Sequence, residues 1–498
     1  MSFYVTTPIY YVNAAPHLGH AYTTIAADVL ARHHRQRGEE VFFLTGTDEH
    51  GEPVADAARA LGIEPQELAD RNSERFRALA PRIDASNDFF IRTTDAQHVA
   101  VVQEVLSRVR ENGFVHRGLY EGWYCPKCAD FKADSETTGD HLCPIHHVQL
   151  VWEQEENYFF ALSAFQGPLE ELYEAQPELV APVSRRNEAL SFIRSGLRDV
   201  PLTRARLRWG VPVPWDPSQV FYVWFDALLN YYSALTYAKP GEDLRRIWPA
   251  DCHLIAKDIL RFHAIYWPAL LIAAELPVPK RIFVHGYLLM EGEKMSKSLG
   301  NVLDPFAVID AFGSDALRFY LMRDVSFGQD GSVSTAAFEQ RYQSELANEY
   351  GNLASRVAAM VHRYREGRLA PAPLDPALAA DLDGAAGEVS ALIDEIELTQ
   401  ALDVIWTRVR RLNRYVEERA PWKLAGDPSG QGELDIVLGS LVTGLRTVSV
   451  LLHPYLPNAT AELLRALGVD DLSLQSASPR VGLPAEIGII GPLFPRIT

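Results

Sequence analysis

The chain has 498 residues, of which 47% are hydrophobic and 10% aromatic, a composition that excludes a disordered or fibrous protein. Its length predicts about three domains. The formal net charge of −18 argues against a protein that coats nucleic acid indiscriminately, although local basic surfaces can still bind one. Because the first residues lack a basic segment and proline interrupts the apolar runs, we expect a cytoplasmic protein that does not enter a membrane.

Strand and helix patterns alternate at the start of the chain. Residues 3–6 and 41–45 form short apolar runs typical of buried strands. The first run is followed by helical spacing that ends at Gly38, and the second by a helical pattern over 53–61. Strand, helix, strand and helix at this spacing predict a parallel α/β sheet.

The pattern becomes irregular over 118–219, and strand-like runs return at 220–224, 253–256 and 281–286. The simplest account is one Rossmann-like domain with a parallel sheet, split by an insertion. From about residue 350 onward, apolar residues recur at helical spacing, which predicts an α-helical bundle.

Three of the four cysteines cluster in the insertion. A Cys-x2-Cys pair is followed after 14 residues by Cys-x2-His, which supplies four ligands from two turns, as tetrahedral zinc requires. Protein fills all four positions and leaves none for a catalytic water, so the predicted Zn2+ is structural. The expected ligands are Cys125, Cys128, Cys143 and His146, with His141 or His147 as alternative imidazoles.

A second feature lies where the first strand gives way to a helix, in the segment Pro16-His17-Leu18-Gly19-His20. A helix N-terminus offers unpaired N–H groups and the positive end of its dipole, which suit a phosphate. Gly19 lacks a side chain that would hold a nucleotide away from the backbone. His17 and His20 can donate hydrogen bonds to phosphate oxygens as charge shifts during a reaction.

A basic loop with the sequence Lys294-Met295-Ser296-Lys297-Ser298 lies between Gly292 and Gly300. Its lysines and hydroxyls suit a pyrophosphate leaving group, and the flanking glycines would let the loop close. The sequence contains no Walker A motif and no G-x-G-x-x-G after a strand, so a nucleotide site here needs another construction.

These two segments, in this order and on either side of an insertion, resemble the motif pair of class I aminoacyl-tRNA synthetases. The resemblance implies that ATP with Mg2+ is used and that the catalytic residues are His17, His20, Lys294 and Lys297. It implies nucleotide contacts by His17, Gly19, His20, Asp258, Lys294, Ser296 and Lys297. Ala256 stands where glycine is common in this class, and its methyl group narrows the approach of ATP to the backbone.

Within the class, four further segments (7–13, 47–51, 223–228 and 262–268) resemble the methionyl-tRNA synthetases. The carboxylate of Asp48 is then expected to hold the α-amino group, and Tyr11 or His263 can offer a weak hydrogen bond to the sulfur. The insertion is too short for the editing domain of the isoleucine, valine and leucine enzymes, which favours methionine. The resemblance implies a methionine pocket made by Ile9, Tyr11, Asp48, Trp224, Ala227, Leu228, Tyr231, His263 and Trp267.

In the helical part, 352–356 and 420–422 resemble family segments that read an anticodon, which implies contacts by Asn352, Arg356 and Trp422. The chain ends before the OB-fold domain that dimerises longer relatives, and we expect a monomer. The expected organisation is a catalytic domain in two halves (1–117 and 220–286) around the zinc-bearing insertion (118–219), a basic-loop and stem-contact region (287–349) and a helical anticodon-binding domain (350–498).

The expected function is ATP-dependent ligation of L-methionine to initiator and elongator methionine tRNA through a methionyl-adenylate, with release of AMP and pyrophosphate. One alternative is another class I ligase that activates a different amino acid. A second is a catalytically silent tRNA-binding paralogue, which the two intact motifs argue against.

Overall fold

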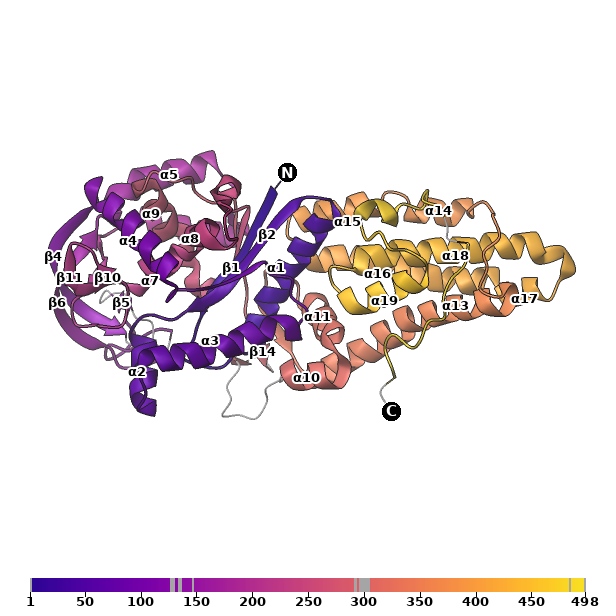
Figure 1. The fold of residues 1–498 in the computed structure, drawn as a ribbon, viewed down its shortest axis with the longest axis horizontal. Helices are drawn as coiled ribbons and strands as arrows, with labels where there is room; N and C mark the ends of the chain where they lie inside the picture. The colour runs from indigo at the N-terminus through magenta and orange to yellow at the C-terminus, as the bar shows by residue number, and fades with distance from the viewer. Residues whose placement is uncertain are drawn as a thin grey trace.

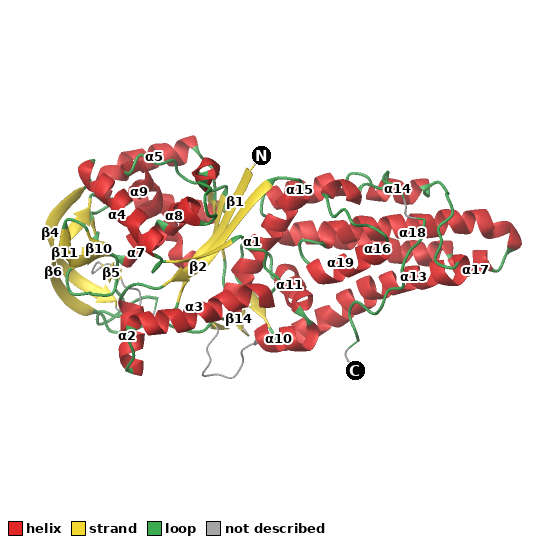
Figure 2. Cartoon of the chain, in the orientation of Figure 1, coloured by secondary structure: helices red, strands yellow, loops and turns green. Residues whose placement is uncertain are grey.

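The computed structural model describes residues 2–125, 130–132, 137–145, 147–290, 293–294, 305–482 and 485–496. The molecule is elongated, with a part containing the main sheet at one end and long helices extending to the other (Figure 1). Strands occur in the first part and at its boundary, whereas the far part is drawn as helices and loops (Figure 2). The N-terminus lies near the junction of the two parts.

A six-stranded parallel sheet forms the centre of the first part, in the order β3-β2-β1-β12-β13-β7. Every neighbouring pair is parallel, so the predicted parallel α/β sheet is confirmed. From β1 the chain adds β2 and β3 on one side of the sheet, whereas β12 and β13 lie on the other side of β1, so the strand order reverses between β1 and β12. In open α/β sheets, ligands bind outside the carboxyl ends of the strands at such a reversal of strand order. The strands are β1 (Ser2–Tyr11), β2 (Glu40–Asp48), β3 (Phe89–Arg92), β7 (Val180–Ala181), β12 (Cys252–Ala256) and β13 (Ile282–His285).

Helices cover both faces of this sheet, which explains why its strands are apolar without alternation. Phe43 of β2 packs in the same hydrophobic cluster as helix α1, whereas Phe42 and Leu44 pack with α4, α8 and α9 on the other face. Besides α5 (Gln166–Ala175), α6 (Val183–Arg194) and α7 (Val223–Leu228), this part contains α1 (Leu18–Gln36), α2 (Glu52–Leu61), α3 (Pro65–Arg82), α4 (Ala96–Glu111), α8 (Asn230–Tyr237) and α9 (Trp267–Ala273).

Between β3 and β12 the chain forms two small antiparallel sheets, in the orders β5-β4-β6-β8 and β10-β11-β9. β7 comes from within the expected insertion but pairs with β13, at the edge of the central sheet. The elements of this region are β4 (Val115–Cys125), β5 (Asp130–Lys132), β6 (Val151–Phe160), α5 (Gln166–Ala175), α6 (Val183–Arg194), β8 (Val200–Pro201), β9 (Thr203–Arg204), β10 (Pro212–Val213) and β11 (Asp216–Phe221).

The expected return to the parallel sheet at 220–224 is wrong. β11 ends at Phe221 and pairs antiparallel with β9 and β10, and helix α7 (Val223–Leu228) follows it. All residues of α7 are buried. A short helix without an exposed face has the same apolar run as a buried strand, so periodicity could not separate the two.

After β13, strands β14, β15 and β16 form a small sheet in the order β15-β14-β16. Helices α10 and α11 lie between β15 and β16 in the chain, and helices follow β16. The helices predicted after residue 350 are present. Among the described helices, Pro428–Leu452 is long and apolar enough to cross a membrane, but 89% of its apolar window is buried, as in a core helix. The elements are β14 (Leu288–Met290), β15 (Glu293–Lys294), α10 (Pro305–Phe312), α11 (Ser314–Arg323), β16 (Gly331–Val333), α12 (Thr335–Arg341), α13 (Asn352–Arg365), α14 (Pro376–Leu382), α15 (Ala385–Asp394), α16 (Leu398–Arg419), α17 (Pro421–Ala425), α18 (Gln431–Leu452) and α19 (Pro457–Ala466).

One hydrophobic cluster continues from the central sheet into the helical part. It contains Val5 of β1 and Leu30 of α1 together with Leu402 of α16 and Leu441 of α18. Helix α1, which begins at the predicted phosphate site, therefore shares a core with the C-terminal helices.

Candidate active site

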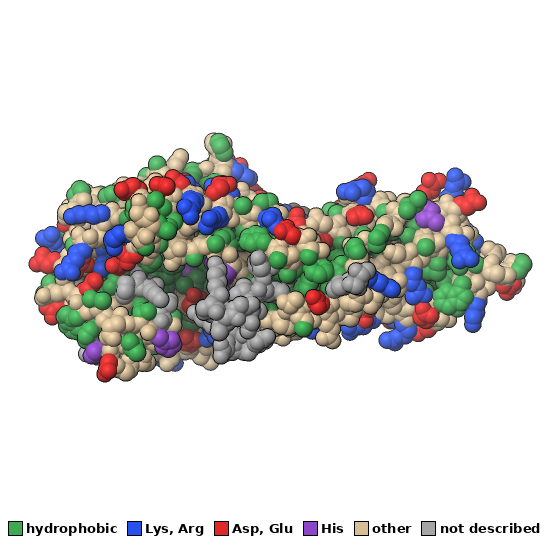
Figure 3. All heavy atoms as spheres, turned by 90° about the horizontal axis from the view of Figure 1, so that it is seen from below, with side chains coloured by type: hydrophobic (Ala, Val, Ile, Leu, Met, Phe, Trp, Pro, Cys, Tyr) green, Lys and Arg blue, Asp and Glu red, His purple; other side chains and the backbone are tan. Residues whose placement is uncertain are grey.

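A cavity of about 500 Å3 opens at the carboxyl ends of β1, β2, β12 and β13, beside the N-terminus of α1. Seen from below, the surface of the sheet-containing part is hollowed, and histidine side chains are visible in the hollow (Figure 3). Most of the residues predicted for the two substrates meet here: Ile9, Tyr11, His17, Gly19, His20, Asp48, Trp224, Ala227, Leu228, Tyr231, Asp258 and His263 all line the cavity.

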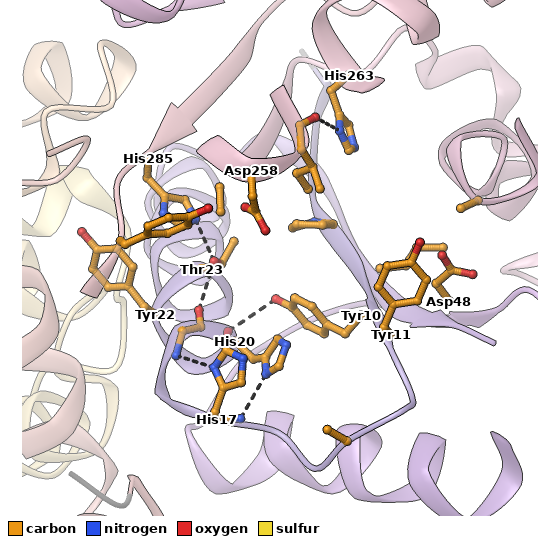
Figure 4. Close-up of a pocket in the computed structure, with 18 of the residues that line it drawn as sticks. Tyr10, Tyr11, His17, His20, Tyr22, Thr23, Asp48, Asp258, His263 and His285 are labelled. Carbon is orange, nitrogen blue, oxygen red and sulfur yellow. Dashed lines mark hydrogen bonds between the residues drawn. The ribbon is translucent and has the colours of Figure 1, made fainter. Parts of the chain in front are cut away.

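His17 and His20 cap the N-terminus of α1 with their side chains (Figure 4). Nδ1 of His17 accepts a hydrogen bond from the backbone N–H of Gly19 at 3.1 Å, and Nδ1 of His20 accepts one from the N–H of His17 at 3.0 Å. Because an accepting nitrogen carries no proton, the proton of each neutral ring lies on Nε2. Burial, and then the proximity of His17, lower the pKa of His20 well below its ordinary value, so His20 is a neutral donor.

Gly19 packs closely against the His17 ring of this cap. A Cβ at position 19 would come within 3.0 Å of Cε1 and 3.1 Å of Nδ1 of His17. A side chain at this position would therefore press on the exposed imidazole, which would have to shift by a few tenths of an ångström. The glycine expected to admit a nucleotide also makes room for the His17 ring.

A chain of hydrogen bonds holds His263 in the opposite wall. Its Nδ1 lies 3.0 Å from the carbonyl oxygen of Ile259, and its Nε2 lies 2.8 Å from the hydroxyl of Tyr231. A carbonyl only accepts, so Nδ1 carries the proton. Burial lowers the pKa of His263 to about 4, so Nε2 is unprotonated and accepts from Tyr231. Both nitrogens are engaged, and this arrangement leaves no N–H of His263 for a substrate sulfur.

Aromatic rings form the side of the cavity next to His263. Trp224 stacks on Phe262 with ring centroids 3.7 Å apart and meets Tyr11 edge-on at 6.2 Å. The indole nitrogen of Trp224 is buried and has no hydrogen-bond partner among the described residues. Trp267, expected in the pocket, is fully buried and packs against Tyr231 at 6.0 Å, outside the residues that line the cavity. Trp267 therefore supports the wall from behind.

Asp48 ends β2 and lies at the cavity (Figure 4). The residue is 2% exposed, and its Oδ1 accepts no hydrogen bond from the part of the chain that the structure describes. Burial, followed by the charges of Asp226 and Glu49, raises the pKa of Asp48 well above its ordinary value. A buried carboxylate oxygen without a donor is unfavourable, so a cationic ligand group in the cavity would stabilise it.

The wall of the cavity beside α1 also contains residues to which the sequence interpretation gave no role. His285 ends β13, and its Nε2 lies 2.8 Å from Oγ1 of Thr23 on α1 (Figure 4). Burial lowers the pKa of His285 to about 4. In the sequence, Thr23 could have been found because it follows His20 by three residues on a predicted helix, which places both on one face. His285 could have been found because it lies at the end of a predicted strand. Ala256, Tyr22, Gly286 and Tyr287 line the same region.

The basic loop falls largely outside the described residues. Ser296 and Lys297 are not among them. For Lys294 the structure describes only the backbone, which lies in β15 opposite Leu289 of β14. The predicted role of this loop stays a prediction.

Two of the four predicted zinc ligands, Cys128 and His146, also lie outside the described residues. Cys125 and Cys143 are fully buried and share a small apolar cluster with Leu150. Within the described ranges, no group of three or more histidine, cysteine, aspartate or glutamate side chains is arranged to hold a metal. The zinc site therefore remains a prediction.

The predicted anticodon residues lie in the helical part. Asn352 begins α13, and Arg356, one turn later, donates to Glu417 of α16 at 2.7 Å. Trp422 on α17 is 41% exposed, and α17 directly follows α16. The fold therefore brings the start of α13 to the end of α16, which leads to Trp422.

Known proteins are similar to this chain in sequence and in fold. The family model described as "tRNA synthetases class I (M)" matches residues 3–149 and 140–358. The chain is 45% identical to a methionine–tRNA ligase of Streptomyces coelicolor, over 100% of this chain and 97% of that one, and 42% identical to one of Thermotoga maritima, over 100% and 80%. The structure of Mycobacterium tuberculosis methionyl-tRNA synthetase in complex with methionyl-adenylate has a TM-score of 0.96 at 41% identity, over 99% of this chain and 100% of that one. The chain belongs to the methionyl-tRNA synthetase family.

Proposed function

We propose that this enzyme ligates L-methionine to its tRNA in two steps. The methionine carboxylate attacks the α-phosphorus of Mg2+-bound ATP, which forms methionyl-adenylate and releases pyrophosphate. The 2′-hydroxyl of the terminal adenosine of the tRNA then takes the acyl group, and AMP leaves. Neither step needs a protein nucleophile, so catalysis depends on the placement of the reactants and on stabilisation of charge.

The observation that carries this proposal is the carboxylate of Asp48 at the cavity. Its buried Oδ1, without a donor from the described chain, suits the α-ammonium group of an amino acid. An amino acid held there would place its side chain against the aromatic wall, where an unbranched, polarizable thioether packs well. We assign to this side-chain pocket Ile9, Tyr11, Trp224, Ala227, Leu228, Tyr231 and His263, with Trp267 behind it.

We assign the α1 side of the cavity to ATP. The Nε2–H groups of His17 and His20 would donate to the phosphates at the N-terminus of α1, next to Gly19. Asp258, directly after β12, would accept from a ribose hydroxyl. Pyrophosphate is assigned to Lys294, Ser296 and Lys297.

A structural zinc fits the chemistry of the cysteines. Two fully buried thiols, Cys125 and Cys143, come from separate segments and meet in one cluster, and zinc prefers thiolate ligands. Cys128 and His146 would complete the set. Bound zinc would join the two turns of the insertion and would take no part in the reaction.

We further propose that the helical part, 350–498, binds the anticodon of initiator and elongator methionine tRNA. The exposed indole of Trp422 offers a plane on which an unstacked base can stack. Asn352 and Arg356 lie on one face of α13 and would supply hydrogen bonds to base edges. The rest of the tRNA would reach the cavity past the 287–349 region.

Amino-acid-dependent exchange between ATP and pyrophosphate tests this function, with metal analysis on the same preparation. Exchange that requires methionine supports the proposal. Exchange with a different amino acid would identify another class I ligase. Binding of tRNA without any exchange would identify a silent paralogue.

A further inference from the structure

The tripeptide Asp48-Glu49-His50 spans the end of β2, and each of its side chains has a different environment. Glu49 is 0% exposed and forms a two-point ion pair with Arg92, with N–O distances of 2.7 and 2.8 Å. Nδ1 of His50 lies 2.6 Å from Oδ2 of Asp226. Buried polar contacts therefore hold both of the residues that directly follow Asp48.

Asp226 is the centre of a buried polar network. It lies on α7 and is 0% exposed. Its other oxygen, Oδ1, lies 2.8 Å from Nε2 of His98 on α4, and Nδ1 of His98 lies 2.7 Å from Oγ of Ser233 on α8. One carboxylate thus joins the loop of Asp48 to three helices.

The charge of Asp226 is retained in this buried position. Burial alone would raise its pKa, but His50 and His98 lower the pKa to about 2, so the group is ionised. Imidazoles occupy both of its oxygens, and Asp226 is not among the residues that line the cavity. Its neighbours on α7, Trp224 and Ala227, do line it.

We propose that Asp226 is a positioning residue for recognition of the methionine α-amino group, because it anchors His50 and thereby directs Asp48 into the cavity. This inference rests on the proposed role of Asp48. A purely structural role of Asp226 in α7 would instead affect the side-chain pocket, since α7 carries Trp224 and Ala227. The two roles predict losses for different parts of the substrate.

The test compares three ligands of the whole protein by their dissociation constants. Methionine carries all groups, methylthiobutanoate lacks the ammonium, and methylthiopropylamine lacks the carboxylate. In Asp226→Asn, the Kd of methionine and of the amine should each rise about tenfold, equivalent to about 1.4 kcal/mol, and that of methylthiobutanoate should not change. His50→Ala should have the same selective effect while Asp226 stays bonded to His98, and this variant separates positioning through His50 from the direct effect of the Asp226 charge on Asp48. A selective loss in Asp226→Asn alone would assign the effect to that charge and overturn the proposal.

Asp315→Asn is the matched control. Asp315 is a buried carboxylate on α11 that accepts from the N–H of Ala459 at 2.7 Å, so its loss perturbs a core bond away from the cavity. This variant should bind all three ligands as the wild type does.

Equal weakening of all three ligands in Asp226→Asn and His50→Ala would overturn the proposal, as would unchanged binding of methionine. Asp48→Asn separates this failure from failure of the proposed function. If Asp48→Asn weakens all ligands equally, the role of Asp48 is wrong. If Asp48→Asn is selective for ligands with an ammonium and the other two variants are not, only the positioning role fails. His50→Ala keeps the inference testable if Asp226→Asn does not fold.

Discussion

Replacement of Arg318 by methionine should destabilise the protein more than replacement of a buried arginine that has no carboxylate partner. Arg318 lies on α11, is 0% exposed and forms an ion pair with Asp28 of α1 at 2.7 Å. It also donates to the carbonyl oxygens of Ile83, Pro454 and Tyr455 at 2.9, 2.6 and 3.1 Å. These bonds connect α1 and the end of α3 to the turn after α18.

Removal of one member of a buried ion pair costs about 3–5 kcal/mol, because the other charge stays buried. Asp28 would keep Arg32 at 2.7 Å and two bonds from Ser86, which lowers the cost. The three carbonyl oxygens that lose a hydrogen-bond donor increase the cost in free energy of unfolding again. We therefore expect a loss of about 4 kcal/mol for Arg318→Met.

Arg446→Met provides the matched comparison. Arg446 is 1% exposed and donates to the carbonyl oxygens of Ser478, Val481 and Gly482, and no carboxylate among the described residues pairs with it. Its loss should cost about 2 kcal/mol, since only neutral acceptors lose a donor. Urea unfolding followed by circular dichroism would compare the two variants with the wild type.

The pH dependence gives a second readout. Burial would raise the pKa of Asp28, but Arg318 and Arg32 lower it overall. A carboxylate with a lowered folded pKa contributes stability above its unfolded pKa of 3.8 and loses that contribution as the pH falls through the folded pKa. The difference between wild type and Arg318→Met should therefore shrink in acid. Equal losses for Arg318→Met and Arg446→Met at neutral pH would refute this reasoning.

Methionine affinity should fall as the pH falls through the raised pKa of Asp48, because a proton then competes with the ammonium group for the carboxylate. Binding of methionine to Asp48→Asn, measured by calorimetry, should show no such pH dependence. A pH dependence that persists in this variant would contradict the assignment of Asp48. Gly19→Ala should reduce kcat for pyrophosphate exchange roughly tenfold, because its Cβ would lie 3.0 Å from Cε1 of His17 and would shift that ring. Gly432→Ala, where a Cβ meets nothing within 4 Å, should keep full activity, and equal loss in both would exclude the cap as the cause. Cys143→Ser should release zinc and lower Tm. Cys252 is also buried, and Cys252→Ser should lower Tm while zinc is retained. A wild-type protein that contains no zinc would exclude the zinc site.

The parallel sheet could be predicted because its strands leave a local trace. Short apolar runs at 3–6, 41–45 and 253–256 fall within β1, β2 and β12, and the helical spacing after the first run corresponds to α1. The prediction failed at 220–224, where a strand of another sheet passes into the fully buried helix α7. Burial on all sides removes the polar face on which a periodicity argument depends.

The sequence by itself was sufficient to indicate the family, because each of its two motifs is one short continuous segment that can be read without knowledge of the fold. Only the tertiary structure decided how the residues of the cavity are supported. It placed Trp267 behind the cavity wall, engaged both nitrogens of His263, and joined His50 and His98 to Asp226 across separations of 176 and 128 residues. Local patterns report which positions are buried, but the partner of a buried polar group is set by the packing of distant elements, where an unpaired group would be costly.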